Sequence, residues 1–145
     1  MPGELDMLAV AILAKDEAQH IAACLHSVAD LADEIVVLLD DRSRDGTAAL
    51  CHAAGARVAV EPWRGYPAQR NRALDLCHEP WVLFLDADER VSPPLRDELR
   101  ALLTDEPSPT APAGYEIPRH NMFFGRVLRG GGWYPDYQLR LVRRT

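Results

Sequence analysis

The most informative segment for the fold of this chain is Trp81-Val82-Leu83-Phe84-Leu85-Asp86-Ala87-Asp88-Glu89. Its apolar first half has the length and composition of a strand buried on both faces, as in a parallel sheet covered by helices. Two aspartates separated by one residue follow at once, and the two-residue period of a strand points both side chains the same way. One such carboxylate can hold a ribose hydroxyl while the other holds a metal ion. A pair of this kind is common and also fits a solvated loop or a helix cap, so the neighbouring segments have to decide.

Other apolar strands also end in acidic residues. We expect strands at Leu8–Leu13, at Ile35–Leu39 and around Val58. Ligands of an open parallel sheet bind beyond the carboxyl ends of its strands. Carboxylates gathered there repel one another, and a divalent cation with a bound diphosphate would supply the missing positive charge. The polar groups at these ends are Lys15-Asp16-Glu17, Asp40-Asp41-Arg42-Ser43, Glu61 and Asp86-Ala87-Asp88-Glu89.

Amphipathic segments alternate with these strands, which predicts an α/β fold with a mainly parallel sheet. The first segment, for example, places Ile21, Leu25 and Val28 at helical spacing. The expected helix boundaries are Asp16 as an N-cap with Gln19 at the capping-box position, Asp45 as the second N-cap, Gly55 as the C′ residue of that helix, Pro67 in the first turn of the third, and Ser92-Pro93 at the start of the fourth.

The bulk composition is that of one globular domain. The chain has 145 residues, of which 48% are hydrophobic and 26% charged, and no apolar run approaches the ~20 residues of a membrane-spanning helix. The N-terminal sequence MPGELDML lacks the basic and apolar regions of a secretory signal, so we expect a cytoplasmic protein. The cysteines, Cys24, Cys51 and Cys77, form no CxxC pair and are expected to be buried thiols.

Charge is unevenly distributed along the sequence. Residues 1–114 carry 10 Lys+Arg and 20 Asp+Glu, whereas residues 115–145 carry 6 arginines and 2 acids. The acidic main part argues against nucleic-acid binding. In the basic part the arginines are interleaved with aromatic residues such as Trp133 and Tyr134. That pattern suits a surface for anionic lipid or a phosphorylated glycolipid, or else a solvated arginine face over an aromatic core.

Several motifs occur in a fixed order along the chain. They are Lys15-Asp16-Glu17, Asp40-Asp41-x-Ser43-x-Asp45-Gly46-Thr47, Gly65-Tyr66-x-Ala68-Gln69-Arg70-Asn71 and Asp86-x-Asp88-Glu89. Together they resemble family 2 glycosyltransferases of the GT-A fold, from about Leu8 to Arg144. The later motifs are similar to the subgroup that contains lipopolysaccharide-core β-glycosyltransferases; these motifs are Gly114-Tyr115-x-Ile117-Pro118-Arg119 and Gly131-Gly132-Trp133-Tyr134-Pro135-Asp136-Tyr137-Gln138-Leu139-Arg140-Leu141.

The resemblance implies a Rossmann-like α/β/α sandwich and an inverting transfer from a UDP-sugar to a glycan or glycolipid acceptor, with Mn²⁺ or Mg²⁺. By motif position it implies that Asp41 reads the uracil base, Asp86 contacts the ribose and Asp88 binds the metal. An aspartate carboxylate is suited to the first role because it can accept the imide N–H of uracil. Glu17 and Arg70 are expected to line the nucleotide pocket. The resemblance also implies cell-envelope biogenesis, in the cytoplasm or peripherally at the inner face of the plasma membrane.

Residues 105–113 contain three prolines and are expected to form a surface connection. They divide a nucleotide-sugar-binding part, 1–104, from the start of an acceptor-side part, 114–145, within a single domain, 1–145. An inverting transferase needs a general base for the acceptor hydroxyl, and Asp136 is the candidate within this sequence. Because family members continue well past this length, we expect a C-terminally truncated chain. The alternative is that Asp136 caps a turn and the base lies beyond Thr145.

Two residues depart from the family pattern: Asp16 stands where Asn is usual, and Arg42 stands where Gly is common. Arg42 either crowds its turn or adds a diphosphate contact. Two other functions stay open. A non-catalytic nucleotide-sugar-binding or assembly module suits the short C-terminal part, whereas a nucleotidyltransferase would need a Gly- and Arg-rich loop in place of Ala14-Lys15-Asp16-Glu17. A dinucleotide-binding domain is excluded because no GxGxxG follows a strand.

Overall fold

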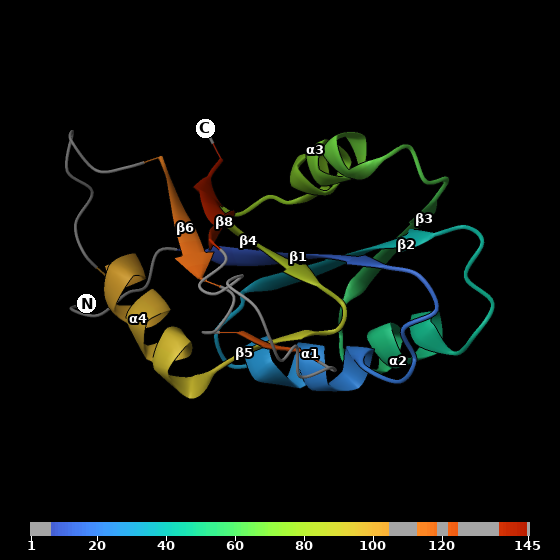
Figure 1. The fold of residues 1–145 in the computed structure, drawn as a ribbon, viewed down its shortest axis with the longest axis horizontal. Helices are drawn as coiled ribbons and strands as arrows, with labels where there is room; N and C mark the ends of the chain where they lie inside the picture. The colour runs from blue at the N-terminus through green and yellow to red at the C-terminus, as the bar shows by residue number, and fades with distance from the viewer. Residues whose placement is uncertain (1–6, 105–112, 119–121, 125–136, 145) are drawn as a thin grey trace, which may run out of the picture.

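The computed structural model describes residues 7–104, 113–118, 122–124 and 137–144 (Figure 1). Its main sheet has the strand order β3-β2-β1-β4-β8-β6. The first four strands in that order are parallel, and β8 runs antiparallel to both of its neighbours. The expected mainly parallel α/β architecture is therefore confirmed. The strands are β1 (Leu8–Ala14), β2 (Glu34–Asp40), β3 (Arg57–Glu61), β4 (Trp81–Asp86), β6 (Gly114–Pro118) and β8 (Tyr137–Arg143).

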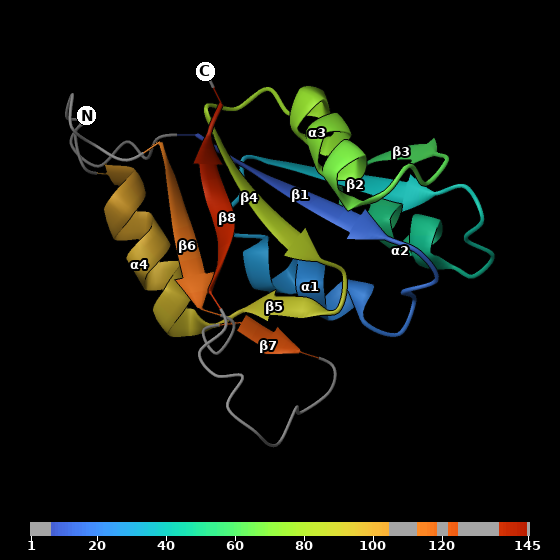
Figure 2. The same ribbon diagram turned by 45° about the horizontal axis from the view of Figure 1, so that its top comes forward.

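Helices cover both faces of this sheet, which is why its central strands are apolar throughout. On one face lie α1 (Ile21–Val28), α2 (Thr47–Ala53) and α4 (Pro93–Thr104), and on the other lies α3 (Tyr66–Leu76) (Figures 1 and 2). Alternate residues of β1 join the two cores. Val10 and Ile12 pack with α1 and α4, whereas Ala9 and Ala11 pack with α3. The small alanines let α3 approach the sheet closely.

A second, two-stranded sheet extends the turn that follows β4 (Figure 2). It consists of β5 (Glu89–Val91) and β7 (Met122–Phe124), paired antiparallel. The hydroxyl of Ser27 accepts the N–H of Val91 at 3.0 Å and ties β5 to α1. Sequence reasoning missed both strands, because three residues are too few to show a strand period.

Most of the expected helix boundaries are confirmed. Gly55 follows α2 with φ of +81°, the left-handed conformation that suits a C′ glycine. Pro67 lies in the first turn of α3, and the hydroxyl of Ser92 accepts the N–H of Leu95 at 3.3 Å at the start of α4. The Asp45 carboxylate accepts an N–H in the first turn of α2, although the backbone cap position is Gly46.

The expected capping role of Asp16 is wrong. Helix α1 begins at Ile21, after His20, and no side chain caps it. Instead, the Glu17 carbonyl accepts the N–H groups of His20 and Ile21 in a preceding turn. Asp16 adopts a positive φ of 49°. Its carboxylate accepts the N–H of Arg44 and so binds the loop after β2 instead of the start of α1.

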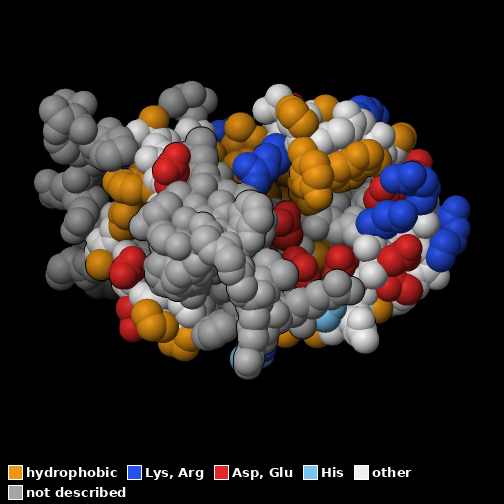
Figure 3. Space-filling view, in the orientation of Figure 1, with side chains coloured by type: hydrophobic (Ala, Val, Ile, Leu, Met, Phe, Trp, Pro, Cys, Tyr) orange, Lys and Arg blue, Asp and Glu red, His pale blue; other side chains and the backbone are white. Residues whose placement is uncertain are grey.

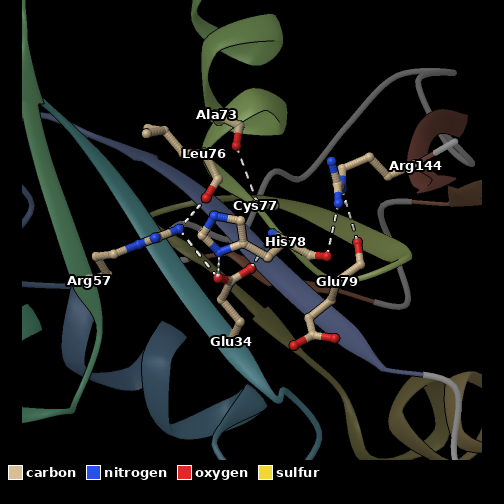
Figure 4. Close-up of polar contacts among 8 residues, drawn as sticks. All are labelled: Glu34, Arg57, Ala73, Leu76, Cys77, His78, Glu79 and Arg144. Atoms are coloured by element: carbon tan, nitrogen blue, oxygen red, sulfur yellow. Dashed lines mark hydrogen bonds and ion pairs between the residues drawn. The ribbon is translucent and has the colours of Figure 1, made fainter.

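A polar network closes the amino end of the parallel strands (Figure 4). The Glu34 carboxylate lies 3.3 Å from the Arg57 guanidinium and 3.1 Å from the His78 ring. Arg144 donates to the backbone carbonyls of His78 and Glu79 at 2.9 and 3.3 Å. A hollow of ≈ 450 Å³ adjoins this network and is lined in part by Glu34 and Arg57, whose charges already pair. This end of the sheet therefore has few charges left to bind a ligand.

The expected buried thiols are confirmed, since all three cysteines are free and buried. Burial raises the pKa of each thiol, to about 11 for Cys77. No helix in the described ranges is long and apolar enough to cross a bilayer.

Candidate functional site

A cavity of ≈ 360 Å³ opens at the carboxyl ends of the parallel strands, where ligands of open α/β sheets bind. The ends of the four parallel strands and the segments that follow them form its wall, and acidic side chains gather there beside a hydrophobic rim (Figure 3). The lining residues are Lys15 and Glu17 after β1, Asp40 and Arg42 at the end of β2, Trp63 and Tyr66 between β3 and the start of α3, and Asp86 and Asp88 at the end of β4.

Arginines neutralise two of the four acidic strand ends. Asp40 is buried, and Arg42 binds its carboxylate through Nη2 at 2.8 Å and Nε at 3.1 Å. These hydrogen bonds hold the pKa of Asp40 at about 2. Likewise, Arg64 and Arg72 pair with Glu61 at 3.2 and 2.9 Å, which lowers the pKa of that carboxyl. The expected mutual repulsion of all four strand ends is therefore wrong, because cations from the adjacent turns intervene.

Negative charge remains concentrated on Glu17, Asp86 and Asp88. Burial raises the pKa of Glu17, and the charge of Asp88 raises it further. Arg140 Nη2 lies 4.0 Å from Asp86 Oδ2, whereas no cation in the described ranges pairs with Glu17 or Asp88. This asymmetry leaves Glu17 and Asp88 as the carboxylates with the most to gain from a bound cation.

The donor atoms at this edge suit a hard divalent ion. No group of three His, Cys, Asp or Glu side chains in the described residues forms a protein-only metal site. Mg²⁺ is commonly held by one or two carboxylates together with substrate phosphates. The two carboxylates of Asp86 and Asp88, beside a cavity that also contains Lys15, fit that mode.

The loops after β1 and β2 are fastened together by hydrogen bonds. One Asp16 oxygen accepts from the Ser43 hydroxyl at 3.2 Å and from the Arg44 N–H at 2.7 Å. The Glu17 N–H donates to the Thr47 hydroxyl at 2.9 Å. These bonds join residues nearly 30 positions apart and fix Glu17 at the cavity wall before any ligand arrives.

The sequence-predicted residues are only partly brought together. Glu17, Asp86 and Asp88 line the cavity. Asp41 lies beside it, exposed, with its N–H donating to the Glu61 carbonyl at 3.0 Å. Arg70 extends from α3 over the ring of Phe84, 5.4 Å from its centroid. Asp136 lies outside the described residues.

Sequence reasoning missed an aromatic pair on the cavity wall. Trp63 and Tyr66 meet edge to face with centroids 4.9 Å apart, and 38% and 63% of their surfaces are exposed. Gly65, with φ of +95°, makes the turn that sets them side by side. The available signal was two aromatic residues flanking a glycine directly after an expected strand. Arg42, for which two roles were open, lines the cavity as the ion-pair partner of Asp40.

Three arginines of the basic segment are held within the fold. Arg140 is buried, Arg143 lies over the Trp81 ring at 4.8 Å, and Arg144 donates to backbone carbonyls. Because Arg140 is buried, it cannot contribute to a basic surface for lipid, whereas Arg143 is half-buried and Arg144 is exposed. For the other arginines, both the lipid surface and its alternative, a solvated arginine face, stay predictions. Arg119, Arg126 and Arg129 lie outside the described residues.

Comparison with known proteins gives a consistent result. The model of "Glycosyl transferase family 2" matches residues 9–144. The lipopolysaccharide core biosynthesis glycosyltransferase LpsC of Rhizobium meliloti is 35% identical over 147 aligned residues, covering 94% of this chain and 51% of that protein. An uncharacterized glycosyltransferase of Rickettsia felis is 40% identical over 95 residues, 66% of this chain and 33% of that protein. The chain thus spans about a third to a half of the length of these two relatives.

Among solved structures, glucosyl-3-phosphoglycerate synthase from Mycobacterium tuberculosis, in complex with Mn²⁺, UDP and phosphoglyceric acid, superposes with a TM-score of 0.56. It is 28% identical in sequence, and the match covers 69% of this chain and 40% of that one. The expected GT-A fold is thereby confirmed.

Proposed function

Because this chain belongs to glycosyltransferase family 2, we propose that its cavity binds the UDP part of a UDP-sugar together with Mn²⁺ or Mg²⁺. The carrying observation is the set of three carboxylates, Glu17, Asp86 and Asp88, on one wall with Trp63 and Tyr66 on another. The carboxylates repel a bare diphosphate, and a divalent ion reverses that repulsion. The aromatic rings offer flat faces to a base or a sugar.

Each carboxylate takes a distinct role in this proposal. By their positions in the motif, Asp88 holds the metal and Asp86 accepts a hydrogen bond from a ribose hydroxyl; among the described residues no protein cation competes for Asp88. Asp41 accepts the imide N–H of uracil, and Glu17 and Arg70 complete the nucleotide pocket. When bound, the metal supplies positive charge that stabilises the diphosphate leaving group. Lys15 and Arg42 add the remaining positive charge at the cavity wall.

For the whole protein, we propose inverting transfer of the sugar to a cell-surface glycan or glycolipid of the lipopolysaccharide-core type. The likeness to LpsC across 94% of this chain supports this acceptor class. Residues 1–104 would bind the donor, and residues 114–145 would begin the acceptor side, with peripheral contact at the inner face of the plasma membrane. Asp136 would act as the general base for the acceptor hydroxyl.

The donor site is tested by calorimetry with UDP, with Mn²⁺ and separately with EDTA. We expect binding with Mn²⁺, weak or no binding in EDTA, and loss of this metal dependence in Asp88→Ala. Asp97→Ala is the matched control, because Asp97 is an exposed acid on α4, outside the cavity. Equal UDP affinity with Mn²⁺ and with EDTA would remove the metal role of Asp88.

The base is tested in the longest natural form of the protein with Asp136→Asn. A fall in kcat of about 10²–10⁴-fold with unchanged UDP affinity supports Asp136 as the base. Near-normal turnover assigns the base to another residue.

A further inference from the structure

Behind the candidate donor site lies a buried ion pair that none of the proposed binding roles uses. Glu89, the first residue of β5, and Arg140 of β8 are fully buried. The guanidinium grips the carboxylate with two bonds, from Nη1 to Oε1 at 2.6 Å and from Nη2 to Oε2 at 2.9 Å. The two residues are 51 positions apart, so the pair joins the last strand of the chain to the turn that carries Asp86 and Asp88.

This pair is poorly explained as a stabilising device. Removing two charges from water is costly, and well-packed apolar residues of similar volume are often as stabilising or more so. The cost is increased here because Arg140 Nε is buried without a hydrogen-bond partner among the residues that the structure describes. A pair kept despite that cost calls for another role.

The backbone contacts of the pair indicate that role. Glu89 Oε1 also accepts the N–H of Asp86 at 2.7 Å, and Arg140 Nη1 reaches the Phe84 carbonyl at 3.4 Å. On its other side, the Asp86 carbonyl accepts a hydrogen bond from the Cys24 thiol at 3.7 Å. The peptide groups on both sides of Asp86 are thus fixed by buried side chains.

The pair also acts on the side chain of Asp86. Arg140 Nη2 lies 4.0 Å from Asp86 Oδ2, close enough to attract the carboxylate toward the sheet. Arg140 can do this because it directly precedes Leu141, which is opposite Leu83 of β4. Its side chain therefore starts beside the end of β4.

We propose that Glu89 and Arg140 are positioning residues that hold the turn Asp86-Ala87-Asp88 in the geometry that binds nucleotide. This inference rests on the proposed donor site. Supporting residues behind a ligand commonly change affinity about 10–100-fold when they are altered. It follows that Arg140 of β8, which comes after the Pro-rich residues in the sequence, influences affinity for the donor through the turn that binds it.

The decisive variant is the double substitution Glu89→Gln with Arg140→Met. It removes both charges at similar volume, so the protein is expected to keep its fold, whereas either single substitution leaves a buried unpaired charge. UDP affinity in Mn²⁺ and the Tm are measured for each variant, with calorimetry run well below its Tm. We expect the folded double variant to bind UDP about 10–100-fold more weakly than the unmutated protein.

Two controls separate positioning from stability. Leu103→Ala opens a cavity in the core at α4 and lowers the Tm, with UDP affinity expected to stay within about twofold. Arg144→Gln removes an arginine near the end of the same strand whose contacts lie at the opposite end of the sheet (Figure 4). It too should leave UDP affinity unchanged.

The outcomes are distinct. Equal UDP affinity in the double variant and the unmutated protein overturns the positioning role while leaving the donor site standing. The positioning role is also overturned if Leu103→Ala loses as much UDP affinity as the double variant for the same decrease in Tm. Failure of the unmutated protein to bind UDP with Mn²⁺ overturns the proposed function and this inference together.

Discussion

Asp16 links two loops of the candidate site, and its removal should loosen both. In the folded chain one carboxylate oxygen accepts from the Ser43 hydroxyl and from the Arg44 N–H, at 3.2 and 2.7 Å. Its φ of 49° is left-handed, a conformation that Asn, Asp and Gly tolerate better than Ala does. The substitution Asp16→Ala therefore removes two hydrogen bonds and adds backbone strain.

The magnitude follows from these two effects. Each hydrogen bond contributes about 0.5–1.5 kcal/mol, nearer the lower value here because the site is exposed. The left-handed backbone costs Ala roughly 1 kcal/mol. We therefore expect Asp16→Ala to lose about 2 kcal/mol of unfolding free energy. Asp16→Asn keeps the accepting oxygen and the backbone tolerance, so its loss should be within about 0.5 kcal/mol.

The assay is urea unfolding followed by far-UV circular dichroism, at pH 7. Asp16→Gly is informative, because it relieves the strain and loses only the hydrogen bonds, and should fall between the Ala and Asn variants. Asp97→Ala, an exposed acid on α4, serves as the control and should change little. If Asp16→Ala is as stable as Asp16→Asn, the tie between the loops contributes nothing and the reasoning is refuted.

Further predictions concern the cavity wall and the core. UDP should be preferred over ADP by on the order of 1–3 kcal/mol, and Asp41→Ala should remove that preference; tight, equal binding of ADP to the unmutated protein counts against the assignment. Trp63→Ala should weaken binding of UDP or of UDP-sugar about tenfold, as measured by calorimetry. Unchanged affinity for both ligands would contradict a stacking role of Trp63. The cysteines should resist a thiol reagent at pH 8 until urea unfolds the chain, since burial raises the pKa of Cys77 to about 11; reaction of the native protein would contradict this. The ion pair with Arg42 lowers the pKa of Asp40 to about 2, so it stabilises the fold above pH ~4 and this stabilisation is lost as the pH falls toward 2. Arg42→Ala should therefore move the midpoint of acid unfolding to higher pH. An unchanged midpoint would argue against the pair.

The four parallel strands of the main sheet could be predicted from the sequence because their signals are local. Each parallel strand is a short apolar run, and its end is marked within two residues by an acid. Helical starts such as Ser92-Pro93 and stops such as Gly55 depend on the backbone preferences of single residues. Asp86 and Asp88 could be chosen because they follow a buried apolar strand in line with the other acidic strand ends. The expected strand period does not hold for both, since β4 ends at Asp86 and Asp88 lies in the turn that follows.

The pairing of the charges depends on the tertiary structure and could not be predicted from the sequence. Whether Asp40 repels its neighbours or binds Arg42 depends on the course of one turn, and Asp16 turned from its expected helix to a loop 27 residues away. The pairing of Glu89 with Arg140 needs β8 to lie antiparallel beside β4, a strand order that no local pattern contains. Side-chain electrostatics vary with distance and burial, and both are properties of the packed chain. Local sequence patterns were enough to tell which residues meet at the edge of the sheet, whereas the packing of the chain sets which of their charges remain available to a ligand.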